Sequence, residues 1–287
     1  MTDPVVTADA GGDRRRFVAP LRGAVDPACF AHPLLHDVQP WSDLLTDDAW
    51  PSIAALDARL ALPDKQLVEQ DTALLGDGLH YEQRIAEGRI ATRTDNWHDL
   101  FNALVWARHP AIKRALNAQQ CRHIGGMGAS RRNRAQAALT QFDESGVIVR
   151  VRAGAAGLLP AWGQHAWTTL FVDGAAHWAN GRIRVLAVIG HALMEQVLLP
   201  GRLLVGKCVV VQGEDDAACL QAVAAAIAEG RLLQDPLQLR PLPLAGIPGW
   251  HADQDGAFYQ QSGYFRAVRE GRVYPPPQCV QENPSSP

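Results

Sequence analysis

The sequence has little of what identifies a disulfide-rich or zinc-knuckle protein. Its five cysteines are scattered and form no Cys-x-x-Cys pair: Cys29, Cys121, Cys208, Cys219 and Cys279. A disulfide framework or a cysteine-rich zinc site is therefore not indicated. Reduced thiols are typical of the cytoplasm, so we expect a cytoplasmic protein.

An excess of charge of one sign and long apolar runs are also missing. The formal net charge is −3 over 287 residues, so no overall field attracts nucleic acid or an anionic membrane. Apolar runs such as VLAVIG are far shorter than the roughly 20 residues that cross a bilayer. The first 20 residues contain no apolar core of a signal peptide. We expect a soluble protein that binds neither a membrane nor nucleic acid.

Motifs for nucleotide cofactors and for a serine nucleophile are absent as well. The segment GGMGASRRNR has neither Walker nor Rossmann spacing, and no predicted strand leads into it. Ser145 lacks the G-x-S-x-G context of a nucleophile elbow. We interpret the stretch with Arg131, Arg132 and Arg134 as a mobile solvated loop, with an anion-binding loop as the alternative.

The composition that is present is that of a globular protein. Hydrophobic residues make up 47% of the chain and charged residues 20%, which is far from the composition of disordered proteins. Predicted strands and helices are intermixed without a regular βαβ order or an internal repeat. We therefore predict an α+β fold, in which helices pack on a small sheet in one domain over 25–275. A flexible segment (1–24) and a disordered tail (276–287) flank that domain.

Hydrophobic periodicity and turn residues predict the individual elements. Helices are expected over 51–62, 96–107, 110–121, 160–179 and 214–230. Strands are expected over 142–152 and 203–213, a hairpin over 80–93, a loop over 121–134, and a strand that passes into a helix near Gly190 over 181–200.

The segment TRTDNWHDLFNALVW places polar residues at the start of an apolar helix. Asn96 suits an N-cap, and Asp99 favours the positive end of the helix. His98 and Asn102 lie four residues apart, at the edge of the apolar stripe. Two interpretations stay open for His98: a histidine that borders the core, or a general base or metal ligand.

Two further polar pairs are candidates. His191 and Glu195 share one face of a predicted apolar helix, where buried polar groups must be paired. They could form a structural pair, Glu195 could orient or activate a histidine, or both residues could bind a metal ion together with His98. Asp143 and Glu144 lie in FDESG, which we interpret as a turn with solvated carboxylates or as acid–base groups at the end of a strand.

At these residues the chain resembles an uncharacterised bacterial family, Domain of Unknown Function 3025. The segments TRTDNWHDLFNALVW, ALTQFDESGVIV, GHALMEQ, PLPLAGIPGW and YFR carry the resemblance, over roughly residues 75–270. The family has no assigned activity, substrate or cofactor. The resemblance implies a recurrent polar pattern at Glu82, Arg93, Asn96, His98, Asp99, Asn102, Asp143, Glu144, His191 and Glu195.

The leading hypothesis is a cytosolic hydrolase with a pocket between the 96–107 and 190–199 helices. Histidines and carboxylates suffice for hydrolysis, and a divalent metal held by His98, His191 and Glu195 is an open alternative. The catalytic candidates are His98, Asn102, Asp143, Glu144, His191 and Glu195. The substrate, a small molecule or an anionic compound, would contact Arg93, Glu82 and Asn96.

The rival hypothesis is a binding or adaptor protein without catalysis. In that case the polar pairs are structural, and the basic loop and the aromatic segment GWHADQDGAFYQQSGYFR contact a partner. A catalytic site requires a closed pocket with perturbed titratable groups, whereas an adaptor requires an open patch.

Overall fold

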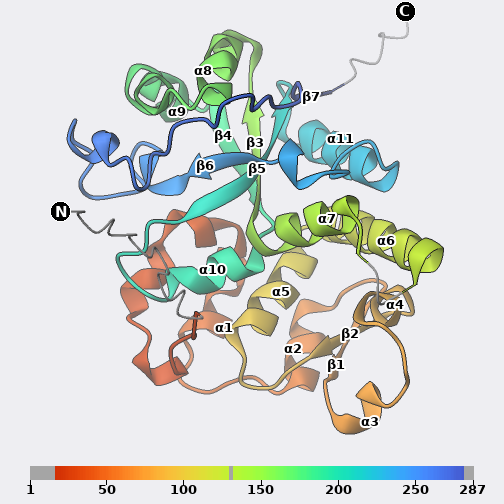
Figure 1. Cartoon of the computed structure of the whole chain (residues 1–287). Helices are drawn as coiled ribbons and strands as arrows, with labels where there is room; N and C mark the ends of the chain where they lie inside the picture. Colours follow the sequence, from red (N-terminus) through yellow and green to blue (C-terminus); the bar gives the residue numbers. More distant parts are fainter. Residues whose placement is uncertain (1–16, 129–131, 281–287) are drawn as a thin grey trace, which may run out of the picture.

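The computed structural model describes residues 17–128 and 132–280. It confirms the predicted α+β class, with helices packed around small sheets (Figure 1). The helices are α1 (Ser42–Thr46), α2 (Ile53–Leu60), α3 (Thr72–Leu75), α4 (Tyr81–Ala86), α5 (Trp97–Arg108), α6 (Pro110–Met127), α7 (Arg134–Ser145), α8 (Leu159–Gly163), α9 (Ala175–Ala179), α10 (His191–Val197) and α11 (Asp216–Ala228).

The larger sheet forms one half of the molecule, together with α8, α9 and α11 (Figure 1). Its strands are β3 (Gly146–Val151), β4 (Ile183–Val188), β5 (Val205–Gln212), β6 (Arg240–Pro243) and β7 (Gln278–Cys279). The order is β4-β3-β5-β6, and β7 pairs with the end of β5. Strand β3 is antiparallel to β4 and parallel to β5. All six residues of β3 are buried, as expected for a valine-rich central strand.

The other half is mainly helical and contains α1 to α5 and α10 (Figure 1). A second, two-stranded sheet of β1 (Gln66–Glu69) and β2 (Arg89–Thr92) lies at its edge. Short 3-10 helices at Arg22–Ala24, Pro27–Ala31 and Pro33–Trp41 pack on this half. Helix α10 lies against α5 and α7, where the two halves of the molecule meet.

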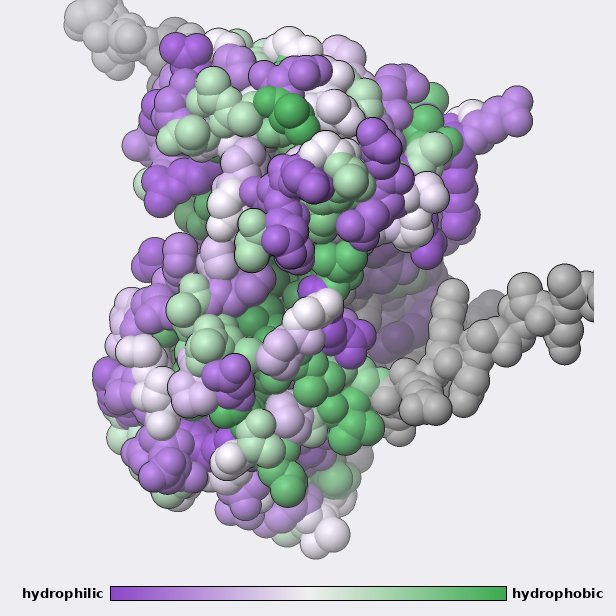
Figure 2. Space-filling view, turned by 90° about the vertical axis from the view of Figure 1, so that its left-hand side faces the viewer, coloured by the Kyte–Doolittle hydropathy of each residue, from purple (hydrophilic) through white to green (hydrophobic). Residues whose placement is uncertain are grey.

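The remaining short helices lie in the connections of the sheet. The structure has 3-10 helices at Ala153–Leu158, Pro236–Gln238, Leu244–Gly246 and Phe258–Gln260, and a π-helix at Thr169–Asp173. The surface in Figure 2 mixes hydrophilic and hydrophobic residues. Within the described part of the chain, no helix combines the length and hydrophobicity needed to cross a membrane.

Helix α5 begins as the sequence predicts. The Asn96 side chain accepts a hydrogen bond from the Asp99 amide at 3.0 Å, which caps the first turn. Trp97, Phe101 and Trp106 are all buried, so the helix is covered on more than one face. Because these buried side chains hold α5 in place, they also determine the direction of the polar side chains in its first turn.

Several predicted elements are wrong. Residues 80–93 form α4 and β2 instead of a hairpin, because His80 and Gln83 build a capping box and β2 pairs in parallel with β1. Helix α6 continues to Met127, well into the predicted loop. The predicted helix over 160–179 is divided into α8, a π-helix and α9.

The prediction for FDESG as a turn is also wrong. Asp143 and Glu144 lie in the last turn of α7, which passes directly into β3 at Gly146. Of the basic loop, Arg131 lies outside the described residues. In the predicted tail, residues 278–279 pair with β5, and residues 281–287 lie outside the described part.

Candidate functional site

Two histidines from helices far apart in the sequence meet where the halves of the molecule join. His98 is the second residue of α5 and His191 is the first residue of α10. Their Nε2 atoms are 3.0 Å apart. His191 is 4% exposed, and His98 is half-buried. The two side chains thus lie next to each other, as a pocket between these two helices requires.

Gly190 allows this arrangement. A Cβ atom at this position would lie 2.6 Å from the Cα of Ser145, so only glycine lets the start of α10 approach the end of α7 so closely. The amides of Ile189 and Gly190 both donate to the carbonyl of Gly146. This junction brings His191 next to the two carboxylates of the last turn of α7.

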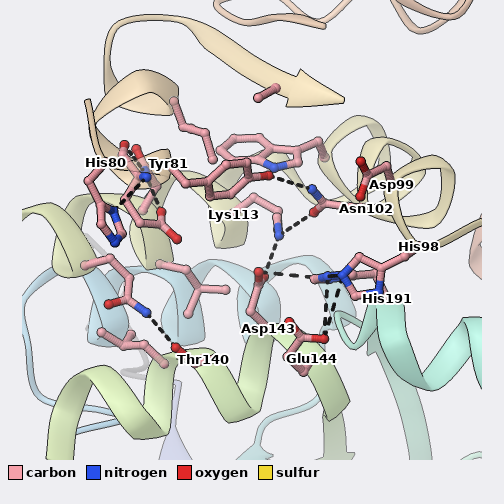
Figure 3. A pocket seen from close by; sticks show the side chains of 18 of the residues that line it. His80, Tyr81, His98, Asp99, Asn102, Lys113, Thr140, Asp143, Glu144 and His191 are labelled. Carbon is pink, nitrogen blue, oxygen red and sulfur yellow. Dashed lines mark hydrogen bonds and ion pairs between the residues drawn. The ribbon is translucent and has the colours of Figure 1, made fainter. Parts of the chain in front are cut away.

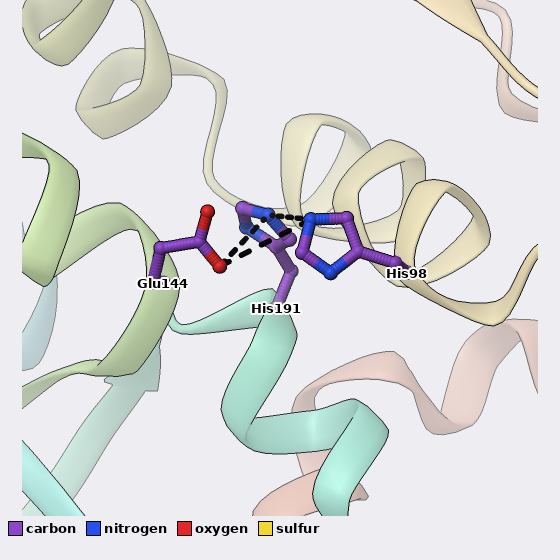
Figure 4. Close-up of side chains that lie close together, drawn as sticks. All are labelled: His98, Glu144 and His191. Atoms are coloured by element: carbon purple, nitrogen blue, oxygen red, sulfur yellow. Dashed lines mark hydrogen bonds and ion pairs between the residues drawn. The ribbon is translucent and has the colours of Figure 1, made fainter. Parts of the chain in front are cut away.

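Glu144 completes a group of three possible ligands with His98 and His191 (Figure 4). Its Oε2 atom lies 4.0 Å from His98 Nε2 and 3.8 Å from His191 Nε2. A point equidistant from the three atoms lies about 2.1 Å from each, within the roughly 2.0–2.2 Å of zinc bonds to nitrogen and oxygen. The three atoms are therefore close enough together to share a single divalent ion.

Glu195 contacts His98 and not its predicted partner. The Nδ1 atom of His98 lies 3.2 Å from Glu195 Oε2, although His191 and Glu195 are four residues apart on α10. Such a carboxylate fixes the tautomer in which Nδ1 carries the proton and Nε2 is free to bind a metal. In the structure Glu144 takes the third ligand position that the sequence assigned to Glu195.

The pKa values of the two histidines are shifted in opposite directions. Burial lowers the pKa of His191 to about 3, against the opposing effect of Asp143. Burial also disfavours the charged form of His98, but the hydrogen bond to Glu195 and the charges of Glu144 and Glu195 outweigh it and raise the pKa of His98. Neutral His191 can therefore accept a hydrogen bond from protonated His98 through the lone pair on its Nε2 atom. The same lone pair could instead bind a metal ion.

Lys113 is a component of the site that the sequence analysis missed. This lysine is 3% exposed, and its Nζ atom lies 2.5 Å from Asp143 Oδ1 and 2.9 Å from Asn102 Oδ1. Asn102 in turn donates to the hydroxyl of Tyr81 at 3.1 Å. Burial opposes ionisation of Asp143, but the charge of Lys113 and the hydrogen bond from Lys113 lower its pKa. A lysine on the same face of α6 as Leu116 and Asn117 was the available signal.

A cavity of about 330 Å³ extends from the histidines between α4, α6 and α7 (Figure 3). Its lining is mostly polar: Gln70, His80, Tyr81, Glu82, Ile85, Ala91, Arg93, His98, Asp99, Asn102, Trp106, Lys113, Leu116, Asn117, Gln120, Arg132, Gln136, Leu139, Thr140, Asp143, Glu144 and His191. One end holds the possible metal ligands, and the other end holds amide and carboxyl groups. The volume suits a small molecule.

The predicted site residues are divided between this cavity and supporting positions. Seven of them line it: Glu82, Arg93, His98, Asn102, Asp143, Glu144 and His191. Asn96 caps α5, and Glu195 supports His98 from outside the cavity. Arg93 donates two side-chain hydrogen bonds to Asp99, at 2.9 and 2.8 Å, so its charge is already matched within the protein.

Comparison with known proteins agrees with the resemblance in the sequence. No curated protein and no solved structure matches the chain. The profile of one family, described as a protein of unknown function (DUF3025), matches residues 65–269. This range contains the three possible ligands, Lys113 and the whole cavity lining. Because the match covers most of the chain, the protein belongs to the DUF3025 family.

Proposed function

We propose that the protein is a metal-dependent hydrolase whose ion is held by His98, Glu144 and His191. The observation that supports this proposal is the proximity of three possible ligand atoms, all within 4.8 Å of one another, in the wall of a polar cavity. Two imidazoles and one carboxylate are a ligand set of catalytic zinc sites, which keep a further position open for water or substrate. The five cysteines are free, which agrees with a cytoplasmic location.

The chemistry would be the addition of water across a bond of the substrate. The water oxygen forms a bond to an acyl or phosphoryl centre, the bond to the leaving group breaks, and a proton passes to the leaving group. A bound divalent ion lowers the pKa of a coordinated water and polarises the bond that is attacked. The protein itself must position the substrate, accept the proton of the water and balance the developing negative charge.

Asp143 and Lys113 are suited to the last two tasks. Lys113 keeps Asp143 ionised despite its burial, so this carboxylate can accept a proton from water. The Lys113 ammonium has three donors, and Asp143 and Asn102 use two of them. The third is available to stabilise negative charge on the substrate in a site shielded from water.

Zinc binding by the full-length chain tests the proposal. We expect one equivalent of Zn²⁺ after chelation and reloading, measured by mass spectrometry of the metal. His98→Ala, His191→Ala and Glu144→Ala should each abolish stoichiometric binding without loss of the fold. His36→Ala, at an exposed histidine, is the matched control and should retain the ion.

Hydrolysis is measured on the same proteins with chromogenic esters, amides and phosphate esters. The proposal expects turnover that requires zinc and is lost in His191→Ala. If the chain binds no stoichiometric metal, or binds it and turns over none of these bonds, the hydrolase proposal is wrong. The second of these results favours a non-catalytic binding protein.

A further inference from the structure

The cavity contains a carboxyl group that no cation binds. Glu82, on α4, lines the cavity away from the histidines, and its Oε2 atom accepts a hydrogen bond from Asn117 Nδ2 at 2.7 Å. Within the described part of the chain, Glu82 makes no ion pair and its Oε1 atom has no hydrogen-bond partner. Burial raises the pKa of Glu82 to about 7, because little in the protein compensates its charge.

The neighbouring cations are already engaged or exposed. Arg93 is bound to Asp99 and Lys113 to Asp143, so neither charge is left for Glu82. Arg132 also lines the cavity, but its side chain is exposed and water screens its effect. The described lining therefore leaves a negative charge unmatched at this end of the cavity.

Two buried amides of α6 that line the same cavity as Glu82 add further acceptor oxygens. Asn117 and Gln120 lie on one face of α6 and are 7% and 8% exposed. Asn117 Nδ2 donates to the backbone carbonyl of Glu82 at 2.8 Å, and Gln120 Nε2 donates to that of Gln136 at 3.4 Å. Since a carbonyl can only accept, these bonds fix both amides with their nitrogens engaged. Their oxygens, Asn117 Oδ1 and Gln120 Oε1, have no partner among the described residues.

We propose that this end of the cavity binds a primary ammonium group of a small-molecule ligand, between the carboxylate of Glu82 and the amide oxygens of Asn117 and Gln120. A primary ammonium has three N–H donors and no acceptor, which matches three acceptor oxygens and one negative charge. The ligand would supply the cation that the buried carboxyl lacks, and so offset its desolvation.

The position of this subsite determines how far the ammonium group lies from the bond that is cleaved in the substrate. This step rests on the proposed hydrolase function. Thr140 accepts a hydrogen bond from Gln120 at 3.1 Å and lies four residues before Glu144 on α7. Four residues of an α-helix span roughly 6 Å. The ammonium group would therefore be separated by only a few bonds from the bond that is cleaved.

Binding of matched amines to the metal-free, full-length protein tests this inference. We choose n-pentylammonium, with 1-pentanol and pentanoate as ligands of the same chain length, and measure affinity by calorimetry or by ligand-observed NMR. The expected result is that pentylammonium binds at least tenfold more tightly than pentanol. Equal or weaker binding of pentylammonium would overturn the inference, and tighter binding of pentanoate would instead support the anionic substrate predicted from the sequence.

Glu82→Gln keeps the size of the side chain and the hydrogen bond from Asn117 while it removes the charge. We expect this variant to bind pentylammonium at least tenfold more weakly, with a melting temperature no lower than that of the unmodified protein. The control Glu87→Gln alters an exposed glutamate just after α4 that pairs with Arg89 and should bind like the unmodified protein. Unchanged binding by Glu82→Gln would overturn the inference.

If Glu82→Gln fails to fold, the affinities of the three ligands for the unmodified protein still test the inference. Because metal is absent, failure of the hydrolase proposal leaves the amine result intact. A zinc-dependent hydrolase that does not discriminate between the three ligands would refute the ammonium site alone.

Discussion

Two histidine–carboxylate groups lie at opposite ends of α5, and they differ in how many of their polar atoms have a partner. At the C-terminal end of the helix, His109 Nε2 lies 3.1 Å from Asp37 Oδ2, which also accepts from the Val188 amide at 3.1 Å. Burial opposes ionisation of Asp37, but the bond and charge of His109 lower its pKa. This group fastens the 3-10 helix Pro33–Trp41 and β4 to the junction of α5 and α6.

At the N-terminal end, His98, His191 and Glu144 point their donor atoms at a common point. His191 Nδ1 is buried without a hydrogen-bond partner in the described structure and lies 4.0 Å from Asp143 Oδ2. A buried histidine is therefore a candidate for function when polar atoms of its ring or of its neighbours have no hydrogen-bond partner. A histidine whose carboxylate is saturated by backbone and side chains stabilises the fold.

The largest expected effect comes from removing the cation beside Asp143. Lys113→Met leaves a buried carboxylate without its partner, and we expect the free energy of unfolding to fall by about 4 kcal/mol. Denaturation with guanidinium chloride measures the change. Arg231→Met, at an exposed pair with Glu229, is the control and should cost less than about 1 kcal/mol.

Adding Asp143→Asn to Lys113→Met sharpens this prediction, because it removes the stranded charge. The double variant should recover much of the lost stability. If it is no more stable than Lys113→Met, the loss comes from packing of the lysine stem and not from the charge.

Asp37→Ala tests the structural group and should cost about 3 kcal/mol, because His109 and the Val188 amide lose a charged acceptor. Zinc binding should remain at one equivalent, since Asp37 belongs to the other group. Loss of zinc in a folded Asp37→Ala protein would break the distinction between the two groups.

Glu82 gives a pH dependence of stability. Its pKa of about 7 in the folded protein lies above the ordinary 4.5, so the folded state binds more protons than the unfolded state between these values. Stability from this group is therefore present below pH 4.5 and is lost as the pH rises through 7. The stability of the unmodified protein minus that of Glu82→Gln should fall by roughly 3 kcal/mol from pH 4.5 to 7.5.

Denaturation at several pH values measures this difference, in which the contributions of other groups cancel. A difference that is flat over this range would show that Glu82 is solvated like a surface carboxylate, which would also weaken the case for the ammonium site.

The smallest expected effect concerns the carboxylate behind His98. Glu195→Gln keeps a side chain that can accept from His98 Nδ1 but removes the charge. The zinc affinity should fall by about tenfold, or 1.4 kcal/mol, as is typical of residues that orient a metal ligand. Competition with a zinc chelator measures the change, and an unchanged affinity would assign Glu195 a purely structural role.

The sequence alone was sufficient to predict features that depend on the residues of a single helix. The N-cap Asn96 and the position of His98 and Asn102 at the edge of an apolar stripe were read from spacing alone. The fold class followed from the intermixed elements. The start of α10 near Gly190 was likewise predicted, although the reason for that glycine, its approach to Ser145, needs the structure.

Contacts between distant helices could not be read in this way. Spacing on α10 suggested a pair of His191 with Glu195, but the packing of α5 turns His98 toward Glu195 instead. Asp143 and Glu144 looked like a turn because Ser-Gly follows them, whereas α7 passes into β3 without a loop. Lys113 was missed because its one signal, a position on the same face of α6 as Leu116 and Asn117, does not reveal the Asp143 carboxylate that it pairs with.

The most direct measurement of the central claim is X-ray absorption at the zinc K-edge on the full-length, zinc-loaded protein. We predict one zinc ion with two imidazole ligands and oxygen ligands at about 2.0–2.2 Å, and loss of one imidazole shell or of the ion in His191→Ala. Absence of stoichiometric zinc, or a spectrum that His191→Ala leaves unchanged, would contradict it.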